Sequence, residues 1–294
     1  MKQNDTLQEK NKVEGGTLYL VATPIGNLSD LSPRALKVLS EVDFIAAEDT
    51  RNSLRMLTHF GISRPLVSYH EHNKRERGED IAARLQGGES CALISDAGTP
   101  AISDPGEDLV VLCAERGIPV TSIPGCCASI TALTLSGLPT ARFCFEGFLP
   151  MDKKERRARL AALADETRTV MLHEAPHKLR TTLQDLAAAL GEERRISLCR
   201  ELTKRNEEIL RTTLADAIAH YEQNEPRGEY VLVIEGGTGT RTASPAAALS
   251  LLSPAEHVAY YENAGHSRMD AIKAAAKDRG MPKNELYRML CNDK

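Results

Sequence analysis

Short apolar runs alternate with segments of helical period along the first half of the chain. Each run ends in turn residues and is followed by apolar positions spaced as on one face of a helix, which is the pattern of strand–loop–helix units. Five such units in succession predict a mostly parallel sheet of the open α/β type, the N-terminal lobe, over residues 17–138. The predicted strands are Thr17–Ala22, Asp43–Ala47, Leu66–Tyr69, Cys91–Ile94 and Pro119–Ile123.

The second half, residues 139–237, repeats the strand and helix patterns less regularly. Two strand candidates, Ile196–Arg200 and Glu208–Thr212, follow one another with no helical segment between them. Consecutive strands joined by a short connection favour antiparallel pairing, so we predict a mixed sheet for this second α/β lobe.

The two ends of the chain differ from the two lobes in composition and in hydrophobic pattern. Polar composition predicts a disordered tail over residues 1–16. A linker is expected over residues 238–253, and residues 254–294 form a small helical appendage in which Arg268–Asp278 and Lys283–Leu290 are the clearest helices. Their helix–turn–helix spacing is compatible with a nucleic-acid contact, although a solvated helical appendage is the commoner explanation.

Composition narrows the class of protein. The 294 residues carry a net charge of −4, which excludes a globally basic nucleic-acid binder but not a local basic surface. No apolar run approaches the roughly 20 residues that span a bilayer, and the N-terminus has no apolar signal region, so we expect a cytoplasmic protein without a membrane partner. The seven cysteines form no C-x-x-C pair and no metal-ligand spacing, so no metal is expected.

The segment Ser90–Asp108 is the strongest candidate for a binding loop. An apolar run ends in Ser95-Asp96, and a loop containing Gly98 leads to the next helical segment. In open α/β sheets, ligands bind beyond the carboxyl ends of the strands, on loops of this kind. An ordinary tight strand-to-helix connection explains this loop equally well when it is considered alone.

The segment Ser90–Asp108 contains one of several motifs that follow one another along the chain in this order: TPIGNLSDLSPRAL, AEDTR, SDAGTPAISDPG, IPGCCASITAL, HEAPHKL and RELTK. Together they resemble the tetrapyrrole-methylase superfamily of S-adenosylmethionine-dependent methyltransferases over roughly residues 15–237. Within it they are similar to the branch that methylates the ribose 2′-hydroxyl of a cytidine in the decoding region of bacterial 16S rRNA. One departure from the tetrapyrrole branch is the turn ATPIGNLSD, which holds Gly26 alone where that branch has a glycine-rich turn.

The resemblance implies two α/β lobes, a homodimer, and 16S rRNA or the small ribosomal subunit as the partner. It also implies S-adenosylmethionine as the methyl donor, bound in the cleft between the lobes. Carried over by position, the donor-binding residues are Pro24, Asp96, Gly98, Thr99, Ile102, Ser103, Ala128, Ser129, Leu172, His173 and Leu202.

Charged residues at the ends of predicted strands are candidates for the chemistry. A ribose hydroxyl is a poor nucleophile, so a group that accepts or polarises its proton is needed. We expect two clusters to line the acceptor pocket, without assigning the base. An alternative is that Asp49 is only a helix cap and that Arg200 forms a structural ion pair. The candidates are Glu48, Asp49, Arg51, Arg200, Glu201 and Lys204.

Two basic segments are candidates for the RNA contact. One follows the third strand, and the other is the densest basic run of the chain. Phosphate contacts by such side chains would make binding depend on salt, whereas the alternative is a solvated helix face paired with nearby acids. The candidate residues are His70, His72, Lys74, Arg75, Lys153, Lys154, Arg156 and Arg157.

Two other functions compete with RNA ribose methylation. A small-molecule methyltransferase, acting on a tetrapyrrole or another metabolite, predicts an enclosed apolar acceptor pocket and has no need of the basic run. A non-catalytic RNA-binding assembly factor predicts RNA binding without donor binding, and the intact SDAGTP and PGCCAS loops weigh against it. A nicotinamide-dependent oxidoreductase is disfavoured because no G-x-G-x-x-G follows the first strand.

Overall fold

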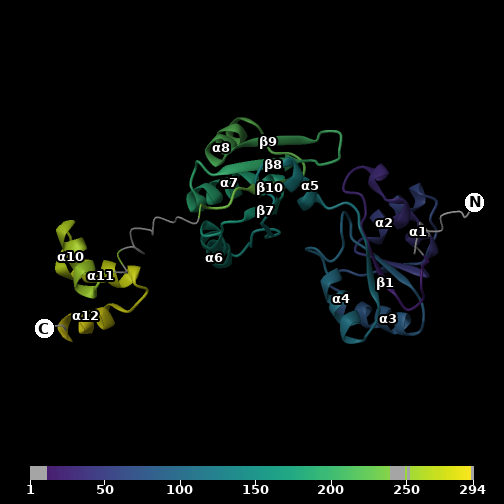
Figure 1. The fold of residues 1–294 in the computed structure, drawn as a ribbon, viewed down its shortest axis with the longest axis horizontal. Coiled ribbons are helices and arrows are strands. Elements are labelled where there is room, and N and C mark those ends of the chain that lie inside the picture. The colour runs from purple at the N-terminus through teal and green to yellow at the C-terminus, as the bar shows by residue number, and fades with distance from the viewer. Residues whose placement is uncertain (1–11, 239–248, 250–251, 293–294) are drawn as a thin grey trace, which may run out of the picture. The chain divides into compact units, whose positions relative to one another are not determined.

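The computed structural model describes residues 12–238, 249 and 252–292 (Figure 1). These residues form two compact units. Unit 1 comprises Met1–Ala164 and Arg168–Gly236, and unit 2 comprises Asp165–Thr167 and Gly237–Lys294. Both predicted sheets lie in unit 1, so the mixed α/β class with C-terminal helices is confirmed.

The first sheet of unit 1 is entirely parallel and has the strand order β3-β2-β4-β1-β5. Its three middle strands are buried almost throughout, which is why they read as continuous apolar runs in the sequence. The strands are β1 (Leu18–Val21), β2 (Phe44–Ala47), β3 (Leu66–Ser68), β4 (Cys91–Ile94) and β5 (Val120–Ile123).

Helices cover both faces of this sheet. Helices α1 and α2 pack on one face through Val38, Leu39 and Leu57, and α3 and α4 pack on the other through Ile81 and Leu109. A short 3-10 turn, η2 (Leu28–Asp30), precedes α1. The helices are α1 (Pro33–Glu41), α2 (Thr50–His59), α3 (Lys74–Gln86) and α4 (Gly106–Glu115).

The second sheet is mixed, with the order β6-β7-β10-β8-β9. Strand β6 runs parallel to β7, and the other neighbours are antiparallel, including the β8–β9 pair that the sequence predicted. The strands are β6 (Phe143–Phe145), β7 (Thr169–Glu174), β8 (Arg195–Arg200), β9 (Glu208–Thr213) and β10 (Tyr230–Ile234).

The two faces of the second sheet are covered by different parts of the chain. Helices α6 (Lys153–Ala164), α7 (Pro176–Leu190) and α8 (Leu214–Gln223) form a core with one face. Helix α5 (Ala128–Leu135), which the sequence grouped with the first lobe, packs on the other face, next to β10 (Figure 1). Burial of Ala132 and Leu133 against that face explains the difference, because periodicity alone does not reveal which sheet a helix covers.

Helix starts differ from the sequence-based expectations by two or three residues. The apolar pattern predicts helices that begin at Leu109 and at Ile130, but α4 begins at Gly106 and α5 begins at Ala128. The first turn of α4 carries Glu107 and Asp108, whose negative charge is favourable at the positive end of the helix dipole. Because both residues are polar, a search for apolar positions at helical spacing does not detect this turn. The dipeptide Ser32-Pro33 predicts an N-cap followed by the first helical residue, and this start of α1 is confirmed, because Ser32 accepts a hydrogen bond from Ala35 N–H and Pro33 occupies the first turn.

The N-terminal segment is only partly described. Residues 1–11 of the expected disordered tail lie outside the described residues. Residues 12–16 contact the first lobe, because Val13 packs on its core and Gly16 N–H donates to Glu89 O at 2.9 Å.

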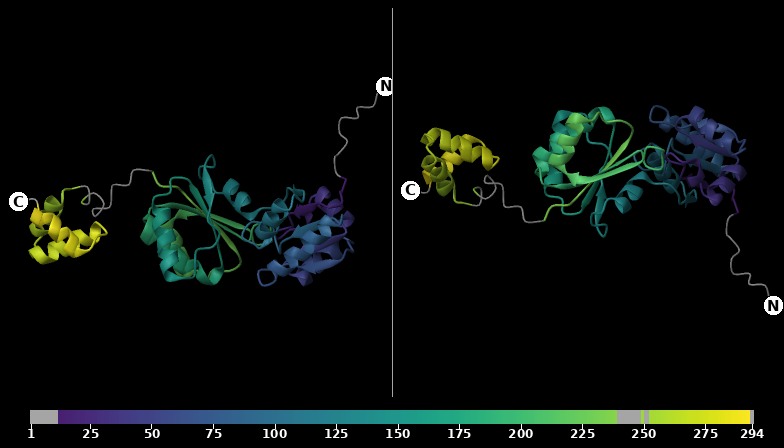
Figure 2. Two further views of the ribbon diagram at one scale, coloured as in Figure 1. Left: turned by 90° about the horizontal axis from the view of Figure 1, so that it is seen from below. Right: turned by 90° about the horizontal axis from the view of Figure 1, so that it is seen from above.

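Unit 2 contains three helices among its described residues: α10 (Pro254–Asn263), α11 (Arg268–Asp278) and α12 (Lys283–Asn292). They enclose a small apolar core around Ile272 and Leu286, and Figure 2 shows the three helices packed together at the yellow end of the chain. Most of the expected linker, residues 239–248 and 250–251, lies outside the described residues. None of the helices in the described ranges is long and apolar enough to cross a membrane.

Candidate active site

The carboxyl ends of β1 and β4 form the centre of the site. These strands are neighbours, but β1 leads to α1 on one face of the sheet and β4 leads to α4 on the other. Their loops meet where Thr23 and Gly98 exchange two backbone hydrogen bonds, at 2.9 and 3.0 Å. Divergent connections of this kind open a crevice at the strand ends, where open α/β sheets bind ligands.

The loop after β4 has an unusual backbone. Gly98 has a φ of +86°, and Ala101 and Ser103 adopt positive φ values of 66° and 62° although they carry side chains. Asp104 holds this turn by accepting hydrogen bonds from Ala101 N–H at 3.0 Å and Gly106 N–H at 2.8 Å. Left-handed backbone at non-glycine residues is strained and clusters at binding sites, so this loop is a candidate for ligand contact.

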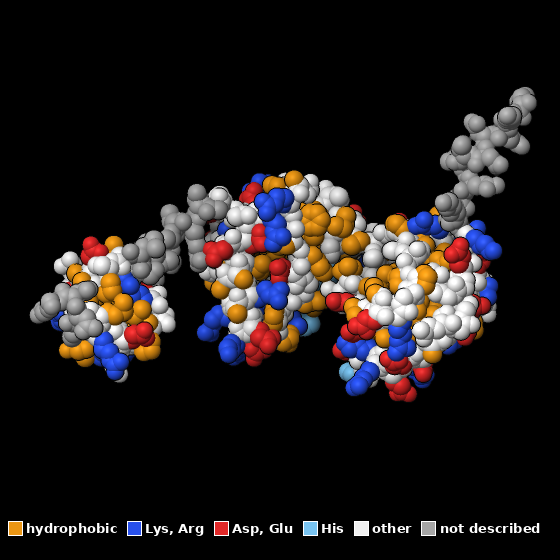
Figure 3. Space-filling view, turned by 60° about the horizontal axis from the view of Figure 1, so that its bottom comes forward, with side chains coloured by type: hydrophobic (Ala, Val, Ile, Leu, Met, Phe, Trp, Pro, Cys, Tyr) orange, Lys and Arg blue, Asp and Glu red, His pale blue; other side chains and the backbone are white. Residues whose placement is uncertain are grey.

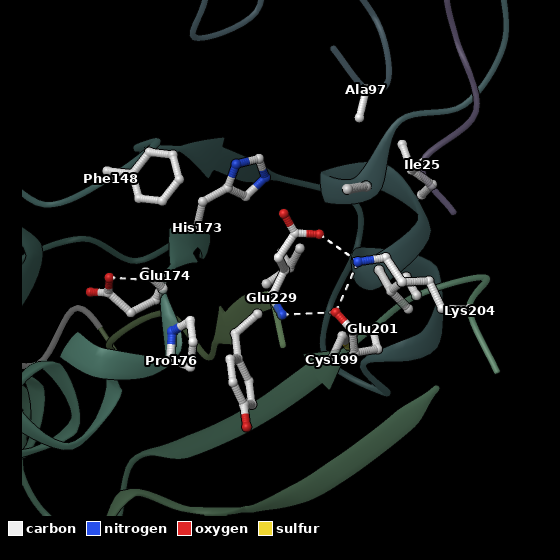
Figure 4. A pocket seen from close by; sticks show the side chains of 15 residues that line it. Ile25, Ala97, Phe148, His173, Glu174, Pro176, Cys199, Glu201, Lys204 and Glu229 are labelled. Atoms are coloured by element: carbon white, nitrogen blue, oxygen red, sulfur yellow. Dashed lines mark hydrogen bonds and ion pairs between the residues drawn. The ribbon is translucent and has the colours of Figure 1, made fainter. Parts of the chain in front are cut away.

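A cavity of about 430 Å³ lies beside these loops, within unit 1 (Figure 4). First-lobe loops supply Ile25 and Ala97, and the second lobe supplies most of the remaining wall, including His173 and Glu201. The volume is typical of pockets that hold small-molecule ligands. Among the described residues, no group of three or more His, Cys, Asp or Glu side chains is arranged to bind a metal ion.

A lysine between two carboxylates marks the wall formed by β8 and β10. Lys204 Nζ lies 2.9 Å from Glu201 Oε1 and 2.6 Å from Glu229 Oε2 (Figure 4). Burial opposes the charged form of Lys204, but the hydrogen bonds to Glu229 and Glu201 outweigh it and raise the lysine's pKa. The hydrogen bond from Lys204 lowers the pKa of Glu201. Lys204 is therefore a cation and Glu201 an anion at neutral pH.

The backbone of the loop after β8 aims this lysine. Glu201 and Thr203 both have positive φ values, 51° and 65°, in a turn that Glu207 closes by accepting a hydrogen bond from Thr203 N–H at 2.6 Å. A Cβ at Gly26 of the first lobe would lie 2.4 Å from Lys204 Cγ. Gly26 therefore gives the first-lobe turn the close approach to Lys204 that a side chain would prevent.

His173 and Ser129 join α5 to the end of β7. The ring nitrogen Nε2 of His173 lies 3.1 Å from Ser129 Oγ, and the rings of Phe145 and Phe148 pack edge-to-face on the imidazole. Burial lowers the pKa of His173, although the nearby charge of Glu229 opposes this effect. The site therefore holds a neutral imidazole at pH 7.

The lowered pKa of His173 predicts an acid-sensitive contribution to stability. Below its ordinary pKa of 6.5, the unfolded chain binds a proton at this residue that the folded chain resists, so stability falls as the pH falls. Between pH 7 and 5.5, His173→Gln should lose less unfolding free energy than the wild type, as measured by urea denaturation. The exposed His59→Gln is the control, and parallel curves for wild type and His173→Gln would refute the expectation.

The donor-binding residues expected from the resemblance mostly surround the cavity. Ala128, His173 and Leu202 line it. Asp96 and Gly98 flank the lining residue Ala97.

The remaining donor candidates lie on neighbouring loops or, in one case, elsewhere. Pro24 precedes the lining residue Ile25, Thr99 Oγ1 donates to Cys126 O at 2.9 Å, and Ile102 is half exposed. The side chain of Leu172 faces away from the cavity, in the core under α6, α7 and α8. Successive residues of a strand point to opposite faces, so His173 faces the cavity and Leu172 cannot.

The first catalytic cluster, Glu48, Asp49 and Arg51, is not among the residues that line this cavity. Asp49 caps α2, because its side chain accepts a hydrogen bond from Arg51 N–H at 2.8 Å. The side chain of Arg51 also donates to Asp49 and is the main cause that lowers the carboxyl pKa to about 2. Burial and the charges of Asp96 and Asp104 raise the pKa of Glu48. Asp49 is therefore the N-cap residue of α2.

The second cluster is split by the strand that carries it. Glu201 and Lys204 line the cavity, but Arg200 lines a separate cavity of about 350 Å³ with Tyr221 and Arg227. Arg200 Nη2 forms an ion pair with Glu208 Oε2 at 2.9 Å. Arg200, like the three residues of the first cluster, therefore does not line this cavity, and it is separated from Glu201 because neighbouring residues at the end of β8 point to opposite faces.

This split predicts different effects of two substitutions. Arg200→Gln breaks a partly exposed ion pair, which should cost about 1 kcal/mol or less of unfolding free energy. Arg200 does not line the cavity that is expected to bind the donor. Donor affinity measured by calorimetry should therefore stay within about twofold of wild type. A large loss of donor affinity in a fully folded Arg200→Gln protein would place this side chain in the site after all.

The first group of RNA candidates is partly engaged within the protein. Lys74 Nζ lies 2.6 Å from Asp108 and 2.9 Å from Glu71, and these hydrogen bonds raise the pKa of the lysine. The rings of His70 and His72 are 6.0 Å apart, and Arg75 is exposed. Arg75 and His72 are thus the more accessible members of this group.

The second group lies at the start of α6. Arg156 is held by Asp185, at 2.7 Å, and by Thr182 Oγ1, at 2.8 Å, so it is a structural residue rather than a free cation. Lys153, Lys154 and Arg157 are exposed. On the face of unit 1 shown in Figure 3, basic side chains are interspersed with acidic ones, so a phosphate contact here would be local.

Two residues of the cavity with a charged or aromatic side chain, Glu229 and Phe148, are not among the candidates predicted from the sequence. The dipeptide Gly228-Glu229 directly before a buried strand was the available indication, since a charged residue there lies at a sheet edge.

Several solved structures share the fold of this chain. Diphthine synthase matches with a TM-score of 0.57 at 15% identity, covering 75% of this chain and 90% of that one. Uroporphyrin-III-C-methyltransferase from Thermus thermophilus matches with a TM-score of 0.54 at 20% identity, covering 75% and 94%. The same enzyme complexed with S-adenyl homocysteine matches at 0.52 and 18%, covering 74% and 97%. The chain therefore shares its fold with these proteins.

The chain belongs to the tetrapyrrole (corrin/porphyrin) methylase family, whose model matches residues 17–218. It is similar to proteins named ribosomal RNA small subunit methyltransferase I. The relative from Halalkalibacterium halodurans is 47% identical over 98% of both chains, and that from Escherichia coli O157:H7 is 44% identical over 98% of both. The relative from Pseudomonas aeruginosa is 53% identical over 76% of this chain and 80% of its own. The family suspected from the motifs is confirmed.

Proposed function

We propose that this protein transfers a methyl group from S-adenosylmethionine to small-subunit ribosomal RNA, at the ribose 2′-hydroxyl of one cytidine in the decoding region. The observation that carries the chemistry is the ion-paired group Glu201–Lys204–Glu229 on the wall of a ligand-sized cavity. The rRNA substrate rests on the relatives named ribosomal RNA small subunit methyltransferase I, which match nearly the whole chain.

The residues present fit the methyl donor. The cavity volume of about 430 Å³ suits a ligand of its size, and small side chains at Ala97 and Ala128 leave the wall open. Gly98, with a φ of +86°, offers backbone without a Cβ, and Ser129 and His173 offer polar atoms. When bound, S-adenosylmethionine supplies a methyl group activated on a sulfonium.

Glu229 is the best-placed acceptor for the hydroxyl proton. Its carboxylate lines the cavity and remains 82% exposed, and only Oε2 is engaged by Lys204 among the described residues. Glu201 is less suited, because its Oε1 already accepts from Lys204 and, at 3.0 Å, from Glu229 N–H. Lys204 orients Glu229 through their ion pair, and a fixed position of the base is what general-base catalysis requires.

The oligomeric state and the cellular location of the protein are also proposals. We propose that the protein acts as a homodimer, as its resemblance to the superfamily implies, and that it works in the cytoplasm, where ribosomal subunits are assembled. Light scattering on the purified protein tests the dimer. A protein that is monomeric at micromolar concentration and retains full activity would contradict the proposed homodimer.

Transfer of label tests the function directly. The purified protein is incubated with labelled S-adenosylmethionine and either naked 16S rRNA or small subunits that lack the modification. We expect label on one cytidine ribose, and Glu229→Gln should abolish it without loss of donor binding by calorimetry. Absence of transfer to either substrate, with donor binding intact, would favour a small-molecule methyltransferase.

A further inference from the structure

An exposed phenylalanine stands at the cavity. Of the five phenylalanines in the chain, Phe148 has the largest exposed fraction, 58%, although it is one of the residues that line the cavity. Removing a phenylalanine side chain from water stabilises a protein by about 1.5–3 kcal/mol, so this ring is left exposed at a cost.

The loop that carries Phe148 is held in place from both sides. Glu146 N–H donates to Met171 O at 2.9 Å, and His173 N–H donates to Gly147 O at 2.8 Å. Gly147 has a φ of +61°, and a Cβ there would lie 3.3 Å from Ser103 Oγ of the first lobe. The ring itself meets the imidazole of His173 edge-to-face, with centroids 5.5 Å apart. Phe148 is thus a positioned ring rather than a loose one.

The surroundings of Phe148 favour a nucleic acid. The loop leads directly into α6, which begins with the exposed Lys153 and Lys154, followed by the exposed Arg157. Met151, between the ring and the lysines, is 75% exposed. Aromatic rings that stack bases, next to cations that contact phosphates, are how proteins bind unpaired RNA.

We propose that Phe148 is a stacking platform for a nucleobase of the RNA, that of the acceptor nucleotide. This inference rests on the proposed function. A planar base could also come from the adenine of the methyl donor. Phe148 lies across the cavity from Ala97 and Ile25 (Figure 4), whose neighbours Gly98 and Thr99 are the expected donor contacts. The position of Phe148 across the cavity from those residues, on the loop that leads into the basic start of α6, therefore assigns the ring to the RNA.

The test compares Phe148→Leu with Phe148→Tyr, and with Phe143→Leu as the matched control. Phe143 is also exposed, at 41%, but is not among the residues that line the cavity. Leucine keeps an apolar side chain but removes the aromatic face, so Phe148→Leu should weaken RNA binding roughly tenfold. Tyrosine should restore it, Phe143→Leu should leave it unchanged, and donor affinity by calorimetry should stay as in the wild type.

A fluorescent base gives a readout that does not depend on methyl transfer. Pyrrolocytosine placed at the target position should be quenched on binding to the wild type and less so on binding to Phe148→Leu. Loss of donor affinity with unchanged RNA binding would overturn the proposal in favour of the adenine. Unchanged RNA binding and quenching would overturn it outright, as would a change of oligomeric state in Phe148→Leu. Failure of the proposed function would instead appear as no transfer by the wild type.

Discussion

Lys204→Met should lower kcat for methyl transfer by about 10²–10³-fold while donor binding changes little. Removing the ammonium leaves the carboxylates of Glu201 and Glu229 facing each other without their shared cation. Their mutual repulsion moves Glu229 away from its present position. The group proposed to accept the hydroxyl proton is then misplaced.

Single-turnover kinetics with saturating donor and RNA measure this effect. Lys37→Met, at an exposed position on α1, removes the same charge elsewhere and should have normal kcat. A shift of the pH–rate profile to higher pH in Lys204→Met would distinguish a positioning role from a merely structural one. Normal kcat in Lys204→Met would show that the ion-paired group takes no part in the chemistry.

Gly228→Ala should damage both stability and activity. Gly228 has a φ of +78°, which costs an alanine about 1–2 kcal/mol. The new Cβ would also lie 2.5 Å from Cγ and 2.6 Å from Cδ of Glu201, so the glutamate must move. Overpacking of this kind costs about 1–3 kcal/mol further and breaks the hydrogen bond from Lys204.

Gly61→Ala is the matched control for this prediction. Gly61 also has a positive φ, 67°, but nothing lies within 4 Å of its would-be Cβ. It should therefore show only the backbone cost, with normal kcat, whereas Gly228→Ala should lose more unfolding free energy and most of its activity. Equal losses of stability in the two variants, with normal activity in both, would contradict the packing argument.

The middle strands of the first sheet could be predicted from sequence because they are buried on both faces. Runs such as Cys91–Ile94 contain no polar residue, and the helices between them carry apolar residues at helical spacing. What periodicity could not reveal was the sheet that α5 covers, since Ala132 and Leu133 read as apolar positions whichever surface buries them.

The site was predictable only in part, for a similar reason. Motif order identified the loops, and Ala128, His173, Glu201 and Lys204 do line the cavity. The motifs do not show on which face of a strand each side chain lies. Side chains alternate between the two faces, which separates Arg200 from Glu201 at the end of β8 and Leu172 from His173 in β7. Glu229 enters the site through its ion pair with Lys204, which joins the ends of two strands distant in sequence.

The place of β10 in the second sheet has a consequence for synthesis of the chain. β10 is the last strand of unit 1 to leave the ribosome, yet it lies between β7 and β8 and forms the surface on which α5 packs. Until about residue 234 has emerged, β7 and β8 lack their shared neighbour and α5 has no complete surface to cover. The first lobe can therefore fold while translation continues, whereas the wall that carries the site assembles only at the end.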